Sequence, residues 1–340
     1  MSLFALSLVL APATNHTHAA PISINVAKVV GALRPIAFAP APSGSKILAS
    51  MEDGSVRVID CKTRETVRVL NRHAQPAYGL AWSPGGQLVA TGDETARIWI
   101  ENALTGQKIR EYRTHKRGIQ KLSFNEFGNL LISTGQDDQV NVYNLQDPKP
   151  KEQLVILGQG MNFYGATFNP ESTRFFTVAM LNGGMREYDC MTGHVNKFFS
   201  DPNGQGMFDV TYSPSGGREV SAGRDGKAIV WDSKTCKRLG SLQGHQDWII
   251  KTAISPNGRL IATSSTDRTV KVWDMYSMTK IADIPDQMSV GSPICFSADG
   301  TTLVSVNVDG SLQFNSITPV QPAAPVVAQV TSKKKRHGHA

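Results

Sequence analysis

Short segments of alternating apolar and polar residues recur along the chain, and each ends in a turn rich in Gly, Pro, Asn or Asp. The stretch from Gly244 to Asp274 shows this most clearly, because its segments IIKTAIS, LIATSS and TVKVWD are separated by the turns PNG at 256–258 and TDR at 266–268. Alternation with a period of two, interrupted by such turns, predicts antiparallel strands joined by tight connections. With the next apolar run, KIADI at 280–284, the stretch predicts a four-stranded unit.

The same unit is repeated over most of the chain. An aromatic or apolar residue followed by a small residue and a turn occurs seven times, at successive spacings of 44, 42, 44, 44, 42 and 42 residues, beginning at Phe38, Trp82, Phe124, Phe168, Tyr212, Ile254 and Phe296. Even spacing of this length is the sequence signature of a repeat architecture. A second and a third predicted strand follow in every unit, and a fourth follows in the first six.

The seventh unit lacks a fourth strand, because the segment TPVQPAAPVVAQ that follows Ile317 carries prolines that interrupt a regular strand ladder. A strand without a unit, ISINVAKVV at 22–30, precedes the first repeat. Because ring closure removes exposed sheet edges, we expect residues 22–30 to complete the last unit. We therefore predict an all-β fold over residues 21–317, a single closed seven-bladed β-propeller with four-stranded antiparallel blades.

The charge of the chain resides largely in its C-terminal segment. Lys and Arg exceed Asp and Glu by 35 − 28 = 7, and the run 333–336 supplies four of these charges, which leaves 7 − 4 = 3 for everything else. The body is therefore only mildly basic, which does not by itself predict nucleic-acid binding. Residues 318–340 are expected to be a disordered Pro/Ala/Val linker and basic tail. Association with nucleic acid or an anionic surface is expected only through that tail.

Residues 1–20 allow two interpretations. The apolar run Leu3–Ala11 has the length of a signal-peptide core, and Thr17-His18-Ala19 resembles a cleavage site, but no Lys or Arg precedes the run. The chain is secreted or periplasmic if this segment is a signal peptide, and cytoplasmic with a leader otherwise. Nine apolar residues are too few to cross a bilayer, which needs ~20, so we expect no membrane helix.

The seven units, with Gly-His at the start and Trp-Asp at the end of the best-preserved one, resemble the WD-repeat family of the G-protein β-subunit type. The resemblance covers residues 22–317 and implies that a tetrad of His, Ser/Thr, Asp and Trp locks a blade. Carried over to this sequence, the structural tetrads would be His245, Ser265, Asp267 and Trp273 in the sixth unit, and His73, Thr91, Asp93 and Trp99 in the second. The third unit has His115 and Asp137 but Gly135 and Tyr143 at the other two places. Because polar networks stabilise only when every member is satisfied, we expect the second and sixth blades to be the most rigid.

The resemblance also implies a function in protein binding without catalysis. The chain contains no GxSxG, HExxH or P-loop motif, and its four cysteines have no metal-ligand spacing. We therefore expect no enzyme activity and no catalytic, cofactor or metal site, and we predict a monomeric interaction scaffold for unidentified protein partners. The alternatives are a propeller enzyme or small-ligand binder that uses the central channel, and tail-mediated association with nucleic acid or a membrane surface.

In this family one face of the disc is formed by the loops that lead into the first strands and by the turns between second and third strands. The predicted partner-binding residues on that face are Trp248, Asp247, Arg224, Lys116, Arg117, Gln136 and Asn162. Trp248 is the strongest candidate, because an indole in a loop beside a carboxylate is typical of an interface anchor. Its other interpretation is packing across the start of the blade.

Overall fold

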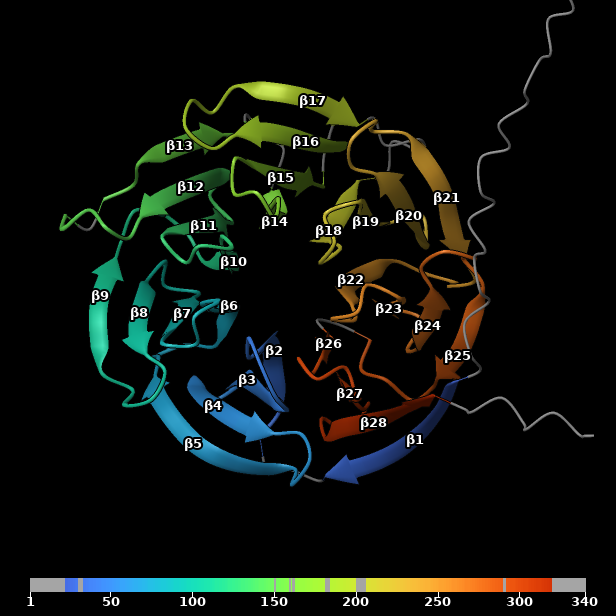
Figure 1. Ribbon diagram of the computed structural model, residues 1–340. Coiled ribbons are helices and arrows are strands. Elements are labelled where there is room, and N and C mark those ends of the chain that lie inside the picture. The colour runs from blue at the N-terminus through green and yellow to red at the C-terminus, as the bar shows by residue number, and fades with distance from the viewer. Residues whose placement is uncertain are drawn as a thin grey trace, which may run out of the picture.

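The computed structural model describes residues 22–29, 33–149, 151–158, 160, 163–180, 184–199, 206–289 and 292–319. Within these ranges every regular element is a strand, and the strands form seven four-stranded sheets around a central axis (Figure 1). The predicted all-β, seven-bladed propeller is thereby confirmed. The described ranges contain no helix of the length and apolar character needed to cross a membrane.

Six blades follow the order of the chain, each from its innermost to its outermost strand. Blades one to three consist of β2 (Pro35–Pro40), β3 (Lys46–Met51), β4 (Ser55–Asp60) and β5 (Glu65–Arg72); β6 (Ala77–Trp82), β7 (Leu88–Asp93), β8 (Ile98–Asn102) and β9 (Lys108–Tyr112); and β10 (Ile119–Phe124), β11 (Leu130–Gly135), β12 (Gln139–Asn144) and β13 (Leu154–Leu157). Blades four to six consist of β14 (Phe163–Phe168), β15 (Arg174–Ala179), β16 (Gly184–Asp189) and β17 (Val195–Phe199); β18 (Met207–Tyr212), β19 (Arg218–Gly223), β20 (Lys227–Asp232) and β21 (Arg238–Gln243); and β22 (Ile249–Ile254), β23 (Leu260–Ser265), β24 (Val270–Asp274) and β25 (Lys280–Ile284).

The seventh blade joins both ends of the described chain. It contains β26 (Cys295–Phe296), β27 (Thr302–Val306) and β28 (Leu312–Pro319), and β1 (Ile22–Val29) lies antiparallel to β28 as its outermost strand (Figure 1). β28 runs two residues past the predicted boundary at 317, because a proline at a strand end removes only one ladder donor. The predicted leader at 1–20, and the predicted tail from residue 320 onward, lie outside the described residues.

The hydrophobic core is divided among the junctions between blades. Each of seven buried clusters combines side chains of two neighbouring blades, so the core forms a closed ring. Phe163 and Phe175 of the fourth blade pack against Val140 of the third, for example, and Ile47 of the first blade packs with Val304 of the seventh. Strand alternation therefore buries both faces of each sheet, and a blade depends on its two neighbours for its core.

The innermost strands of the first six blades share a β-bulge near their first residue. The bulged residues are Ile36, Tyr78, Gln120, Tyr164, Phe208 and Ile250. The residues that follow them occupy a common register and are here called the post-bulge residues: Ala37, Gly79, Lys121, Gly165, Asp209 and Lys251. Because a bulge changes the direction of a side chain, the bulged residue does not follow the regular alternation of its strand.

Candidate docking surface

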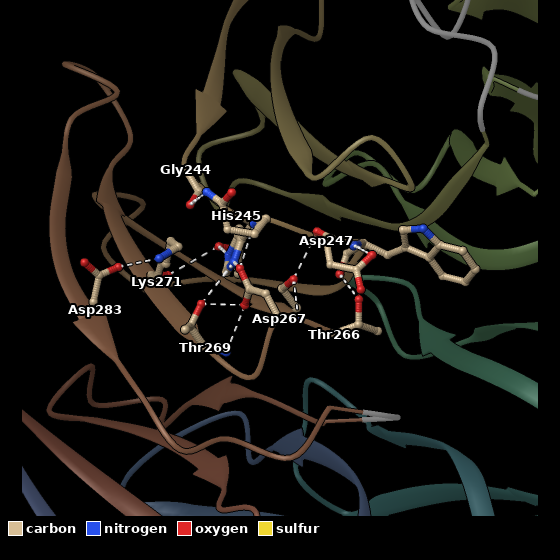
Figure 2. Close-up of polar contacts among 12 residues, drawn as sticks. Gly244, His245, Asp247, Thr266, Asp267, Thr269, Lys271 and Asp283 are labelled. Carbon is tan, nitrogen blue, oxygen red and sulfur yellow. Dashed lines mark hydrogen bonds and ion pairs between the residues drawn. The ribbon is translucent and has the colours of Figure 1, made fainter.

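A chain of buried hydrogen bonds links the strands of the sixth blade. The Nδ1 atom of His245 lies 2.8 Å from Asp267 Oδ2, and its Nε2 lies 2.8 Å from Thr263 Oγ1. The indole N–H of Trp273 donates to the same Thr263 hydroxyl at 2.9 Å. Figure 2 shows His245 directed toward Asp267 and Thr269.

The hydroxyl in this chain belongs to Thr263, so the prediction of Ser265 was wrong. Both residues lie on the same face of β23, and alternation alone cannot choose between them. The register of β23 against β24 determines which hydroxyl meets the Trp273 indole. Thr263 lies opposite Lys271 within the sheet, whereas Ser265 is the last residue of its strand. Ser265 instead donates to the backbone oxygen of Asp247 at 3.0 Å, in the loop that carries the strongest docking candidate.

The third blade contains a similar chain that the motif comparison missed. His115 contacts Asp137 at 2.9 Å and Ser133 at 2.6 Å, and the Ser133 hydroxyl lies 3.2 Å from the hydroxyl of Tyr143. Ser133 follows its histidine by 18 residues, the same separation that joins His245 to its threonine. The expected hydroxyl position at Gly135 was therefore shifted by two residues, and tyrosine takes the place of tryptophan.

The second blade forms only part of the predicted tetrad. His73 bonds to Thr91 at 2.7 Å and to Asp93 at 2.9 Å. Trp99 stacks on His73 with ring centroids 3.9 Å apart, but its indole nitrogen has no hydrogen-bond partner in the described part of the chain. Trp99 lies directly opposite Thr91, so the next inward-facing residue, Glu101, receives the threonine's hydrogen bond at 3.5 Å. Burial raises the pKa of Glu101 to about 7.

The electrostatics of the sixth-blade chain fit a structural role. Burial opposes ionisation of Asp267, but hydrogen bonds from Thr269, the Gln246 amide and His245 lower its pKa to about 2. Burial lowers the pKa of His245, so its neutral ring donates through Nδ1 and accepts through Nε2. These groups hold the loop between β21 and β22 against the blade.

Trp248 lies in that loop and is held through its backbone. Its N–H donates to Asp247 Oδ1 at 2.8 Å, and its carbonyl accepts from the Thr266 amide at 3.0 Å. The Trp248 residue is 40% exposed. The alternative interpretation, packing of Trp248 across the start of the blade, accounts for only part of its surface, because the ring stacks on Phe208 while the residue stays 40% exposed.

The exposed indole is the end of an aromatic series that begins on the bulged residues. Phe208 stacks against Trp248 with centroids 5.6 Å apart, and Tyr164 meets the edge of Phe208 at 5.5 Å. On Trp248 the guanidinium carbon of Arg224 lies 4.3 Å from the ring centroid, within cation–π distance. We call Tyr164, Phe208, Arg224, Asp247 and Trp248 the Trp248 surface.

The Trp248 surface borders an open cavity of about 490 Å³. Three of the predicted docking residues line it together, with four neighbours that sequence reasoning did not select: Arg224, Asp247 and Trp248, with Asp225, Lys227, His245 and Gln246. The cavity wall therefore carries charges of both signs beside one aromatic ring, a composition suited to oriented polar recognition.

Three other predicted docking residues form a separate group on the third blade. The Lys116 amide donates to Asp137 Oδ2 at 2.7 Å and the Gln136 amide donates to the Gly118 carbonyl at 2.8 Å, while the side chains of Lys116, Arg117 and Gln136 are exposed. The structure does not place them at the cavity of the Trp248 surface. Asn162 lies outside the described residues.

Phe208 and Tyr164 are the members of the surface that sequence reasoning missed. Both are bulged residues at the second position of an innermost strand, where regular alternation alone would not direct them toward Trp248. A bulge is a single-residue irregularity with no reliable sequence pattern. Across the part of the chain that the structure describes, no group of three or more His, Cys, Asp or Glu side chains is arranged to hold a metal ion.

The closed ring of seven sheets and the His–Ser/Thr–Asp chains define a propeller built from WD-type blades. The family model described as "WD domain, G-beta repeat" matches residues 64–99, 106–144, 188–232 and 236–274. With the seven-bladed fold, these matches show that the chain belongs to the WD-repeat family.

Several curated proteins are similar to the chain at low identity. It is 23% identical over 295 residues to Denticleless protein homolog A of Xenopus laevis, across 70% of this chain and 41% of that protein. It is 25% identical to Protein hir1 of Schizosaccharomyces pombe, across 65% of this chain and 22% of that protein. It is 23% identical to a subunit of Chromatin assembly factor 1 from Mus musculus, across 67% of this chain and 37% of that protein. The chain thus spans less than half the length of each of these relatives.

Proposed function

We propose that this protein is a non-enzymatic scaffold that binds a protein partner through the Trp248 surface. The observation that carries the proposal is the exposed indole of Trp248, which is fixed by two backbone hydrogen bonds and packed between Phe208 and Arg224. Trp and Arg are among the residues most enriched in the side chains that dominate binding energy. A prearranged pair loses little conformational entropy on binding.

The charge of the surrounding face favours a partner with acidic residues. Within the described chain the guanidinium of Arg224 forms no ion pair, and neither do the side chains of Lys116 and Arg117. Such cations attract an acidic partner and increase its association rate at low ionic strength. A carboxylate of that partner would bond to Arg224 while an apolar group covers Trp248.

Membership in the WD-repeat family supports this proposal at the level of the class. One similar protein is, by its name, a subunit of a chromatin assembly factor, which is an assembly of several chains. Because the present chain covers only part of each relative, the identity of its own partner does not follow from them. We further propose that the propeller itself is monomeric.

The compartment of the protein remains a proposal that depends on residues 1–20. If this segment is a signal peptide, the mature chain begins near Ala19 or Ala20, and the partner is extracytoplasmic. The mass of the purified mature chain distinguishes this from an intact leader.

The docking proposal is tested by comparing two matched aromatic–arginine pairs on opposite faces. Tyr276 lies in the turn between β24 and β25, is 50% exposed, and has the Arg218 guanidinium carbon 4.4 Å from its ring. Wild type, Trp248→Ala and Tyr276→Ala would each be used to capture partners, which mass spectrometry then identifies. We expect one partner to be lost only from Trp248→Ala, while the thermal stabilities of both variants remain close to that of wild type.

Arg224→Glu provides a second variant in which the indole is kept. It should also lose the partner, because it replaces the cation on the ring with a negative charge that repels an acidic ligand. Unfolding of Trp248→Ala would assign the indole a structural role, and equal capture by all variants would reject the Trp248 surface as the docking site.

A further inference from the structure

Three charged side chains occupy the same register on the innermost strands of the ring, and one of them, Asp209, directly follows Phe208 of the Trp248 surface. They are the post-bulge residues Lys121 of β10, Asp209 of β18 and Lys251 of β22, which come from the third, fifth and sixth blades. The other three post-bulge residues are alanine or glycine and carry no charge. These innermost strands border the central opening in Figure 1.

Lys121 reaches across an entire blade to its partner. Its Nζ atom lies 2.5 Å from Asp209 Oδ1 and 3.2 Å from the carbonyl oxygen of Val210. The intervening fourth blade has Gly165 at this register, where a Cβ would lie 3.4 Å from Asp209 Oδ1 and 2.9 Å from a methyl of Val178. A side chain at Gly165 would therefore crowd Val178 and Asp209, the partner of the lysine.

Asp209 has little capacity left for a second cation. Its side chain is 2% exposed, and its other oxygen accepts from the amide of Thr252 at 3.0 Å and from the Thr252 hydroxyl at 3.3 Å. Burial opposes its ionisation, but the charges of Lys121 and Lys251 keep the pKa of Asp209 below its ordinary value. The carboxylate is therefore ionised, and three of its roughly four acceptor positions are occupied.

Lys251 is the cation left over in this group. Across the described residues its ammonium group makes no hydrogen bond or ion pair, although it is only partly exposed. Burial lowers the pKa of Lys251, Asp209 opposes this shift, and the like charge of Lys121 adds to it. A cation held at low exposure without a contacting anion is unfavourable.

The unused hydrogen-bond donors can be counted. Each ammonium has three N–H groups, and Lys121 uses two of them, on Asp209 and Val210. One donor of Lys121 and three of Lys251 are left, which makes 1 + 3 = 4. Two positive charges against one negative charge leave a surplus of one.

We propose that this site binds a small oxyanion of the phosphate or carboxylate class, held by Lys251 and the free N–H of Lys121. The anion would neutralise the surplus charge and satisfy the unused donors. Asp209 would act as a positioning residue, because it orients Lys121 while its own oxygens are occupied. Two ammonium groups beside a single carboxylate disfavour a metal cation, which gives the site its selectivity for negative charge.

Thermal unfolding of the full chain would be measured with increasing inorganic phosphate, acetate or chloride at matched ionic strength. We expect the unfolding temperature to rise saturably with phosphate, acetate or both, and not with chloride, because ligand that binds the native state stabilises it. The anion with the larger shift identifies the preferred oxyanion. Lys251→Met should weaken that binding about tenfold or more, as expected for loss of a charge-assisted hydrogen bond, and Lys251→Arg should retain it.

The control is Lys237→Met, which removes an exposed lysine on the fifth blade and should respond like wild type. Without added anion, Lys251→Met should be at least as stable as wild type, because it removes an unpaired cation. Failure of phosphate and acetate to exceed chloride, or an undiminished response in Lys251→Met, would overturn the proposal. Neither result bears on partner capture by the Trp248 surface.

Discussion

Replacement of Thr263 by valine should destabilise the sixth blade more than replacement of Ser265 by alanine. Valine has nearly the same shape as threonine, so the substitution leaves no cavity. It removes the group that donates to His245 Nε2 and accepts from the indole N–H of Trp273. Both of these partners are buried, and Thr263 itself is 0% exposed, so water cannot replace the hydroxyl.

The magnitude follows from the two polar atoms that lose their partner. Leaving a buried donor or acceptor unsatisfied costs about 1–3 kcal/mol, so Thr263→Val should lower the free energy of unfolding by about 2–6 kcal/mol. Ser265→Ala removes bonds to the Asp247 carbonyl and from the Asp267 amide, at 3.0 and 3.1 Å. Ser265 is itself 0% exposed, but both partners belong to loop residues that are not buried. Because water can reach that loop, its cost should be about 1 kcal/mol.

Urea-induced unfolding, followed by tryptophan fluorescence and circular dichroism, would give the free energy of unfolding of the two variants. The comparison uses one common value for the dependence of that free energy on urea concentration. Coincident transitions of the two signals would show that a single free energy describes the data. Thr91→Val is the matched control in the second blade, where the second bond of the threonine is a long one of 3.5 Å to Glu101 instead of a 2.9 Å bond from an indole N–H, and its effect should be smaller. A loss for Ser265→Ala that equals or exceeds that of Thr263→Val would refute the assignment of the hydroxyl.

Two further predictions concern the junctions of the ring. Burial, with the neighbouring carboxylate of Glu187, raises the pKa of Glu219 from 4.5 to about 8. Protonation of Glu219 therefore stabilises the folded protein fully below pH 4.5, and this contribution is lost as the pH rises through about 8. Glu219→Gln should gain stability relative to wild type as the pH rises between these two values, by up to ~1.4 kcal/mol per pH unit, and a constant difference in unfolding temperature across that range would contradict this. Removal of residues 1–30 deletes β1 and exposes the edge of β28 along eight paired positions. Size-exclusion chromatography should then show aggregates, because an exposed strand edge pairs with other chains. A stable monomer with the wild-type unfolding temperature would show that β1 is dispensable.

The repeat spacing was enough to predict the number of blades, because each blade uses the same alternation and the same turn residues. Strand β1 could be expected for a related reason, since the seventh unit lacked a strand and the chain before the first unit had one to spare. The pairing in the tetrads was less accessible. Thr263 and Ser265 share one face of one strand, and only the register against the third strand distinguishes them.

Contacts between side chains of different blades could not be predicted from the repeat pattern of the sequence. Asp209 and Lys121 are 88 residues apart and belong to blades separated by the fourth blade, which has a glycine beside Asp209. Phe208 supports Trp248 because a bulge redirects it, and Glu101 takes the position of Trp273 because Trp99 lies directly opposite Thr91, two residues earlier on its strand. Each of these depends on how strands and sheets pair and pack, which periodicity within one blade does not encode.

The most direct test of the docking account is the dissociation constant of a captured, purified partner measured against three forms of the full chain. For Trp248→Ala the account predicts binding about thirtyfold weaker than wild type, which corresponds to an anchor residue worth about 2 kcal/mol. Tyr276→Ala should bind as wild type does, and all three forms should unfold at similar temperatures. Equal affinities for wild type and Trp248→Ala, or a loss shared by Tyr276→Ala, would contradict the claim that the Trp248 surface is where this propeller binds its partner.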